Sequence, residues 1–367
     1  MQKHVKRTRY LVIGILLLLA VVWSLASAGR GNAGGEYPRS ELLASAEWLH
    51  EHAGDPDMVI LDVRTDDHFD GKLIPGAVRL PWSAFRYDSR SSNMGELFVG
   101  PERAQEILGE NGIGRTDTIV LYDSVKRDGG ATASYVFWVL DVLGHEKKRI
   151  LEGGIDAWER AGFGVESTPK TLQKILYQAP TDAVKPDRWV DGRFVSQRLG
   201  DPFYQILDVR SREEYLGQKG SKDLHGNPLK LGHIPTAVNI EYKQNWVDEE
   251  TKMIKPYSEL QELYRGLDPE RGVIVYCDSG RRGSFSYFVL RLMGFAHVSA
   301  YEASWKEWGH PALFFPVETL ERTLAGEALP GASAGRASGT VIRADEESKA
   351  ASEPAGEPQG GYVSCGG

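Results

Sequence analysis

Residues 273–284 read VIVYCDSGRRGS, so an apolar run leads directly into Cys277. A helix-like segment, residues 285–293, follows the glycine and arginine residues of this stretch. The order predicts a buried parallel strand, a tight loop and a helix. Backbone N–H groups at the start of such a helix favour negative charge, which biases a cysteine held there toward the thiolate. The stretch therefore predicts an α/β fold with a nucleophilic cysteine at the end of a strand.

The remaining residues of this stretch have the properties of an anion-binding loop. Glycine allows a tight turn, and two neighbouring arginines stabilise an anionic nucleophile and hold an anionic substrate. An inert buried cysteine would leave these glycine and arginine residues unexplained. The predicted active-site loop after Cys277 consists of Asp278, Ser279, Gly280, Arg281, Arg282 and Gly283.

The central part of the chain contains an internal duplication. A D-V-R segment, an I-P-x-A segment and a third apolar run occur twice in the same order, and a constant offset of 150 relates Glu152 to Glu302 and Trp158 to Trp308. The paired segments are 59–64 and 205–210, 74–78 and 234–238, and 119–122 and 273–276. A repeat of this kind predicts two copies of one structural unit.

Each copy alternates short apolar runs with helical patterns, which predicts a parallel sheet flanked by helices. Ala179-Pro180 and Lys185-Pro186 interrupt the pattern between the copies and predict a linker. The predicted segments are an N-terminal signal or anchor (1–35), a first domain without cysteine (36–170), the linker (171–187), a catalytic domain (188–322) and a disordered tail (323–367).

The N-terminal segment has the pattern of an export signal. Lysine and arginine residues precede an apolar run at 11–23, and Ala26-Ser27-Ala28 follows it. A basic leader, an apolar core and small residues at such a site are typical of a secretory signal. We expect export to the periplasm or another extracytoplasmic space, with residues 11–28 either cleaved off or kept as a membrane anchor.

Composition excludes several other classes. The chain has 367 residues and a net charge of −8, which gives no support for nucleic-acid binding. Two cysteines are too few for a disulfide framework, and no typical metal-ligand spacing is present. We therefore expect no metal and no cofactor.

Together, the paired D-V-R and I-P-x-A segments and the Cys-x-x-Gly-x-Arg loop resemble the rhodanese family. The resemblance covers about residues 38–316 and is to tandem-domain sulfurtransferases of the thiosulfate/3-mercaptopyruvate type. It implies that Cys277 takes sulfur from a small donor, becomes a persulfide and passes the sulfur to cyanide or a thiol. It also implies that Arg210 and Arg282 bind the donor.

The resemblance assigns other residues to support. Asp208 is expected to brace loops, and His233 and Trp305 are expected mainly in structural roles. The first copy has Asp123 where the second has Cys277, so it cannot form a persulfide. As in tandem relatives, the first copy should be a scaffold beside the cleft, with Asp62 and Arg64 structural.

The choice of donor rests on departures from the family pattern. Ser279 resembles the 3-mercaptopyruvate type, but Asp278 fits neither type. Leu73 replaces the histidine that usually precedes I-P-G-A, and Glu214 stands where a second carboxylate-binding arginine is usual. These losses favour thiosulfate, with 3-mercaptopyruvate as the alternative and a non-catalytic sulfur-binding or sensing module as the further one. A phosphatase would need an arginine where Gly283 stands.

The second cysteine lies almost at the C-terminus, in Ser364-Cys365-Gly366-Gly367. This ending resembles the glycine-flanked cysteine of sulfur-oxidation carrier proteins. A long polar tether would let Cys365 reach the cleft of its own chain and accept sulfur there. The alternatives are a thiol without a specific role and a disulfide partner.

Overall fold

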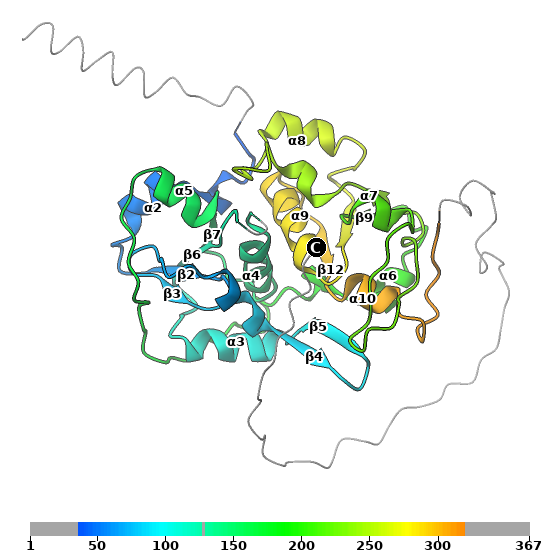
Figure 1. Ribbon diagram of the computed structural model, residues 1–367, viewed down its shortest axis with the longest axis horizontal. Coiled ribbons are helices and arrows are strands. Elements are labelled where there is room, and N and C mark those ends of the chain that lie inside the picture. Colours follow the sequence, from blue (N-terminus) through cyan, green and yellow to red (C-terminus); the bar gives the residue numbers. More distant parts are fainter. Residues whose placement is uncertain (1–35, 127–128, 320–367) are drawn as a thin grey trace, which may run out of the picture. The chain divides into compact units, whose positions relative to one another are not determined.

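The computed structural model describes residues 36–126 and 129–319 (Figure 1). The predicted signal segment, the predicted tail and Cys365 lie outside the described residues. Within the described ranges, no helix is both long enough and apolar enough to cross a membrane.

The two copies form two five-stranded parallel sheets with the same strand order. The first sheet has the order β1-β7-β6-β2-β3 and the second has β8-β12-β11-β9-β10. The strands of the first sheet are β1 (Leu43–Ala44), β2 (Met58–Asp62), β3 (Val78–Arg79), β6 (Thr118–Tyr122) and β7 (Lys148–Leu151). Those of the second are β8 (Trp189–Val190), β9 (Tyr204–Asp208), β10 (Val238–Asn239), β11 (Gly272–Tyr276) and β12 (Val298–Tyr301). The predicted duplication and parallel α/β architecture are confirmed.

Helices cover both faces of each sheet, which explains why the central strands are apolar at nearly every position. The α-helices are α2 (Ala46–His52), α3 (Pro101–Glu110), α4 (Ala131–Val142), α5 (Gly154–Arg160), α6 (Gly192–Ser196), α7 (Arg212–Tyr215), α8 (Tyr257–Leu263), α9 (Arg281–Leu292) and α10 (Ser304–Trp308). Short 3₁₀ turns lie at Ser40–Leu42, Asp66–His68, Trp82–Phe85, Pro186–Arg188 and Tyr242–Asn245.

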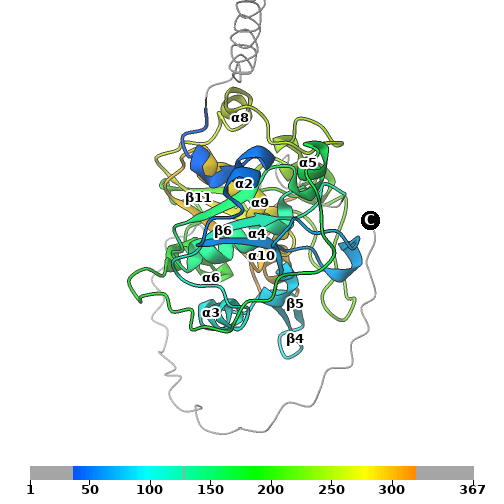
Figure 2. The same ribbon diagram turned by 90° about the vertical axis from the view of Figure 1, so that its left-hand side faces the viewer.

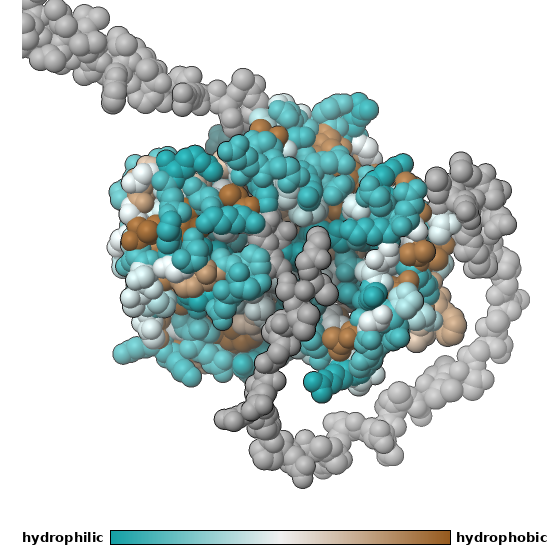
Figure 3. Space-filling view, in the orientation of Figure 1, coloured by the Kyte–Doolittle hydropathy of each residue, from teal (hydrophilic) through white to brown (hydrophobic). Residues whose placement is uncertain are grey.

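Helices α4 and α9 pack against each other between the two sheets (Figures 1 and 2). Every residue of α4 is buried, and the rings of Phe137 and Phe288 meet with centroids 4.9 Å apart. A helix that is buried on all sides belongs to the core. The two copies therefore share one apolar core, which continues through this helix pair. The outer face of the molecule in Figure 3 is, in contrast, mostly hydrophilic, with separate hydrophobic patches.

A hairpin of the first copy reaches the second copy beside α10 (Figure 1). It consists of β4 (Arg86–Ser89) and β5 (Met94–Phe98), which pair antiparallel. At its end the Phe98 N–H donates to the carboxylate of Glu302 at 3.1 Å. The duplicate contact runs in the other direction, because the Ile254 N–H donates to Glu152 at 3.0 Å. Each copy thus anchors the other through a glutamate, which is buried in the case of Glu302 and half-buried in the case of Glu152.

Candidate active site

The loop that carries Cys277 lies between the end of β11 and the start of α9. β11 and β9 pair with Tyr276 opposite Asp208, so Cys277 and Arg210 follow neighbouring strand ends. Gly280 has a φ of 83°, and a Cβ there would lie 2.9 Å from the carbonyl oxygen of Glu302. Only glycine fits this turn without strain. The turn brings the first turn of α9 up to the sulfur, since a Cβ on Gly283 would lie 3.7 Å from the Cys277 Sγ.

The first residues of α10 fix the backbone of Cys277 through two hydrogen bonds. The Cys277 N–H donates to the Ser304 Oγ at 3.0 Å, and the Trp305 N–H donates to the Cys277 carbonyl at 3.1 Å. The Ser304 Oγ lies 4.0 Å from the Sγ. Cys277 is 1% exposed. The nucleophile is therefore fixed in a nearly closed site.

Arg282 forms a bidentate ion pair with Glu214 of α7. Its Nη1 and Nη2 atoms donate to the two carboxylate oxygens at 2.7 and 2.8 Å. Burial alone would raise the pKa of Glu214, but the hydrogen bonds and charge of Arg282 lower it to about 2. Burial alone would lower the pKa of the Arg282 guanidinium, but the Glu214 carboxylate and an ionised Cys277 raise the pKa of Arg282 above its ordinary value. Arg282 thus acts electrostatically on the cysteine and is balanced by a permanent carboxylate.

In the first copy, the Asp123 side chain occupies the N–H groups of the loop that corresponds to the Cys277 loop. The Asp123 carboxylate accepts N–H groups of Gly130, Thr132 and Ala133 at 3.0–3.2 Å, and the Thr132 hydroxyl at 2.8 Å. Burial raises the pKa of Asp123 against these hydrogen bonds. The amides that would otherwise favour a sulfur anion at the start of α4 are occupied. The first copy lacks both the nucleophile and the open amide loop.

Comparison with known proteins identifies the fold and its family. The sequence model of the Rhodanese-like domain matches residues 45–161 and 193–310. The chain belongs to the rhodanese family. It is 31% identical over 304 residues to a thiosulfate sulfurtransferase of Corynebacterium glutamicum, covering 78% of this chain and 94% of that protein. It is also 33% identical over 280 residues to SseA, a putative thiosulfate sulfurtransferase of Mycobacterium tuberculosis, covering 75% and 90%.

Solved structures of other proteins are similar to this fold. A variant of EanB in complex with ergothioneine is 25% identical to this chain, with a TM-score of 0.66 over 78% of this chain and 71% of that one. An anaerobic ergothioneine biosynthesis enzyme from Chlorobium limicola, bound to trimethyl histidine, gives a TM-score of 0.65 at 24% identity, over 78% and 72%. At that identity the likeness shows the fold alone.

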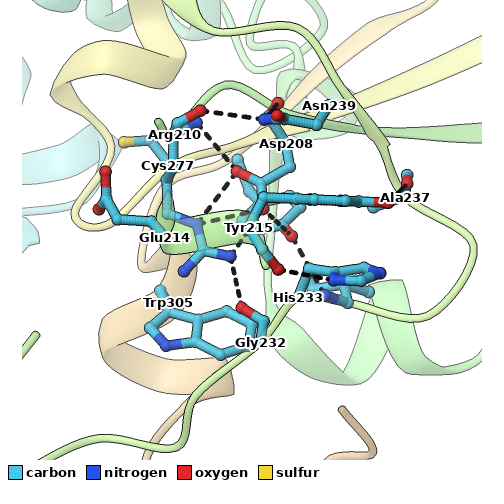
Figure 4. A network of polar contacts seen from close by, with 12 residues as sticks. Asp208, Arg210, Glu214, Tyr215, Gly232, His233, Ala237, Asn239, Cys277 and Trp305 are labelled. Atoms are coloured by element: carbon cyan, nitrogen blue, oxygen red, sulfur yellow. Dashed lines mark hydrogen bonds and ion pairs between the residues drawn. The ribbon is translucent and has the colours of Figure 1, made fainter. Parts of the chain in front are cut away.

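Arg210, which the sequence predicts to bind the donor, is held within the rhodanese fold. Its guanidinium pairs with Asp208 at 2.6 Å, donates to the Gly232 carbonyl at 2.8 Å and lies 4.1 Å from the ring of Trp305. Figure 4 shows this group turned toward Trp305 and Gly232, away from the Cys277 sulfur. In the cysteine-free copy, Arg64 pairs with Asp62 in the same way at 2.7 Å. The arrangement braces both copies, and the donor role of Arg210 stays a prediction.

The other predicted residues lie around these groups. Asp278 forms an ion pair with Lys306 at 3.6 Å. The Arg281 guanidinium lies 6.0 Å from the ring of Trp82 of the first copy. His233 stacks on Tyr215, and burial lowers its pKa. Within the described part of the chain, no cluster of three His, Cys, Asp or Glu side chains could hold a metal ion.

Sequence reasoning missed Arg86, which the first copy contributes to the loop. Its Nη2 donates to the Ser279 carbonyl at 2.6 Å, across a sequence separation of 193 residues. Burial opposes its charge, but the pKa of Arg86 is raised by acidic neighbours that include Glu302 and an ionised Cys277. Only tertiary structure brings Arg86 to the site, and no local pattern signals it. The first copy is therefore a structural part of the active site.

Proposed function

We propose that the protein is a thiosulfate sulfurtransferase that works through a Cys277 persulfide. The observation that supports this most directly is the position of Cys277 in the loop between β11 and α9, where Arg282 and Arg86 interact with it electrostatically. The helix N-terminus and these cations favour a sulfur anion at this point. The relatives from Corynebacterium and Mycobacterium, which carry this activity in their names, support the same conclusion.

The reaction has two covalent steps. The Cys277 thiolate attacks the sulfane sulfur of thiosulfate, the S–S bond breaks, and sulfite leaves with the bonding electron pair. The outer sulfur of the persulfide is then attacked by cyanide or a thiolate, which regenerates the Cys277 thiolate. With cyanide the product is thiocyanate. Each step moves one sulfur atom without its bonding electron pair, so no external oxidant or reductant is needed.

The surroundings of Arg282 support thiosulfate over 3-mercaptopyruvate. Glu214 stands where relatives of the carboxylate-binding type carry an arginine, and here it neutralises Arg282. A second arginine for a donor carboxylate is therefore absent at that position. Thiosulfate has no carboxylate to bind, and the two arginines Arg86 and Arg282 still interact electrostatically with an ionised Cys277.

The test is a side-by-side assay of the two donors with cyanide as the acceptor. We expect thiocyanate formation from thiosulfate at a higher kcat/KM than from 3-mercaptopyruvate, and none with Cys277→Ser. Cys365→Ser is the matched control and should retain full cyanide-dependent turnover. Absence of turnover with both donors in the unmodified protein would refute the enzymatic function and favour a sulfur-binding or sensing module.

A second proposal concerns the terminal cysteine. We propose that the Cys365 thiolate attacks the outer sulfur of the Cys277 persulfide and carries that sulfur to an acceptor. The support is the Ser-Cys-Gly-Gly ending of the sequence. Peptide mass spectrometry after loading with thiosulfate should find added sulfur on both cysteines. Sulfur confined to Cys277 would refute this role.

We also propose that the protein acts outside the cytoplasm. The support is the basic and apolar pattern of residues 3–28. Fractionation of the producing cell should find the chain in the periplasm or attached to the membrane from outside. N-terminal sequencing then distinguishes cleavage after the apolar run from retention of residues 11–28. A cytoplasmic chain with its first residues intact would contradict the proposal.

A further inference from the structure

Ser304 has a backbone conformation that serine rarely adopts. Its φ is 53°, in the left-handed region, and the residue is fully buried at the start of α10. Side chains with a Cβ are disfavoured there, and such strain concentrates at functional sites. Ser304 is thus a buried serine in a strained conformation that contacts the Cys277 backbone, and this strain needs a physical explanation.

The duplicated copy provides an internal control for this position. The equivalent residue is Gly154, whose φ is 56°. The following N–H makes the same hydrogen bond in both copies, from Ile155 to the Asp123 carbonyl at 3.0 Å and from Trp305 to the Cys277 carbonyl at 3.1 Å. The backbone therefore needs only a glycine here. The second copy has a serine instead, beside the cysteine that the first copy lacks.

The Ser304 hydroxyl makes three contacts that explain the exchange. It accepts the Cys277 N–H at 3.0 Å, donates to the Tyr301 carbonyl at 2.7 Å and lies 4.0 Å from the Cys277 Sγ. A hydroxyl can rotate its single proton between two acceptors. An anionic sulfur is a stronger acceptor than a neutral carbonyl, because hydrogen bonds to charged groups are the stronger ones.

We infer that Ser304 is a positioning residue for Cys277: its hydroxyl holds the cysteine backbone and turns its proton to the sulfur when the sulfur is ionised. The proton stays on the Ser304 oxygen throughout, so no bond is made or broken. The carbonyl of Tyr301 accepts the proton when Cys277 is a neutral thiol. This inference rests on the proposed role of Cys277 as the nucleophile.

The test compares Ser304→Ala and Ser304→Gly in the full chain. Both variants lose the hydroxyl, but only glycine relieves the left-handed strain. The rate of alkylation of Cys277 by iodoacetamide is followed against pH, with the Cys277 peptide quantified by mass spectrometry so that Cys365 does not contribute. We expect the midpoint pH of alkylation to rise by about one unit in both variants, the size of effect for one lost hydrogen bond to an anion.

Stability separates strain from chemistry. The melting temperature of Ser304→Gly should exceed that of Ser304→Ala by a few degrees, about the shift expected for relief of one strained residue in a chain of this size. Ser284→Ala is the matched control, because Ser284 is a buried serine near the loop whose hydroxyl donates to the Arg281 carbonyl at 2.7 Å. Its alkylation midpoint should match that of the unmodified protein.

An unchanged alkylation midpoint in both Ser304 variants would overturn the inference. A midpoint restored in Ser304→Gly but not in Ser304→Ala would also overturn it, because backbone geometry and not the hydroxyl would then be responsible. Alkylation needs no sulfur donor. If the protein fails to turn over thiosulfate, the proposed function falls while the Ser304 measurement remains decisive.

Discussion

Replacing Glu214 with glutamine should improve the use of thiosulfate. In the native protein Arg282 is engaged by a carboxylate that also repels an incoming dianion. Glutamine keeps the size and one hydrogen-bond acceptor but removes the charge. Arg282 is then available to the donor, and kcat/KM for thiosulfate should rise.

The size of this effect follows from the exposure of the pair. The side chains of Arg282 and Glu214 are 18% and 11% exposed. Their interaction lies between an exposed pair, worth about 1 kcal/mol or less, and a fully buried pair, whose disruption costs about 3–5 kcal/mol. We take about 2 kcal/mol for the release of Arg282, which corresponds to a ceiling of roughly thirtyfold. Because the donor recovers only part of this, we expect about a tenfold gain.

The assay measures kcat/KM for thiosulfate with cyanide between pH 6 and 9. The pKa of Glu214 is lowered to about 2 by its partner despite burial, so Glu214 stays ionised across this range and the gain should not vary with pH. The stability that the pair contributes is present above the ordinary pKa of glutamate and is lost only as the pH falls toward 2. Added salt should shrink the gain through screening.

Glu213→Gln is the matched control for Glu214→Gln. Glu213 is the exposed neighbour on the same helix, so its replacement changes the net charge equally without touching Arg282. Its kcat/KM should stay within about twofold of the native value, as for a rim charge. An unchanged or lower kcat/KM in Glu214→Gln, with the fold intact, would refute the reasoning.

Three further predictions concern groups around the loop. Burial raises the pKa of Glu302 to about 7. The stability that the protonated Glu302 contributes is therefore present below the ordinary pKa of glutamate and is lost as the pH rises through 7. The free energy of unfolding of Glu302→Gln, measured with urea, should vary less between pH 5 and 8 than that of the native protein. Asp123→Ala leaves buried donors without an acceptor and should lower the free energy of unfolding by about 3 kcal/mol, measured in the same way; a loss below about 1 kcal/mol would contradict the described hydrogen bonds. Arg86→Gln removes a charged hydrogen bond to the loop and should reduce kcat/KM for thiosulfate by about tenfold; native kinetics would show that the hairpin has no effect on the site.

The duplication made most of the fold predictable from the sequence. Repeated apolar runs and D-V-R segments indicate two parallel sheets because buried strands need apolar residues on both faces. The loop of Cys277 was predictable for the same reason, since a strand that ends in a glycine-rich turn before a helix has few other conformations. What the sequence could not show is the direction of each side chain at the site.

Arg210 and Ser304 illustrate that limit in opposite ways. The D-x-R segment is also present in the cysteine-free copy and its arginine forms the same ion pair there, while the predicted donor role of Arg210 stays a prediction. The offset between the copies aligns Ser304 with Gly154, so the exchange was visible in the sequence, but its meaning depends on a φ value and a hydrogen bond. Arg86 gave no such signal, because its partner lies in the other copy.

Incubation with thiosulfate alone, followed by intact-mass and peptide mass spectrometry, tests the central chemical step without any acceptor. A sulfur atom gained by the peptide that contains Cys277, removable by cyanide and released as an equal amount of thiocyanate, is the predicted result. No mass gain on that peptide, or an equal gain elsewhere in a Cys277→Ser, Cys365→Ser double variant, would contradict it.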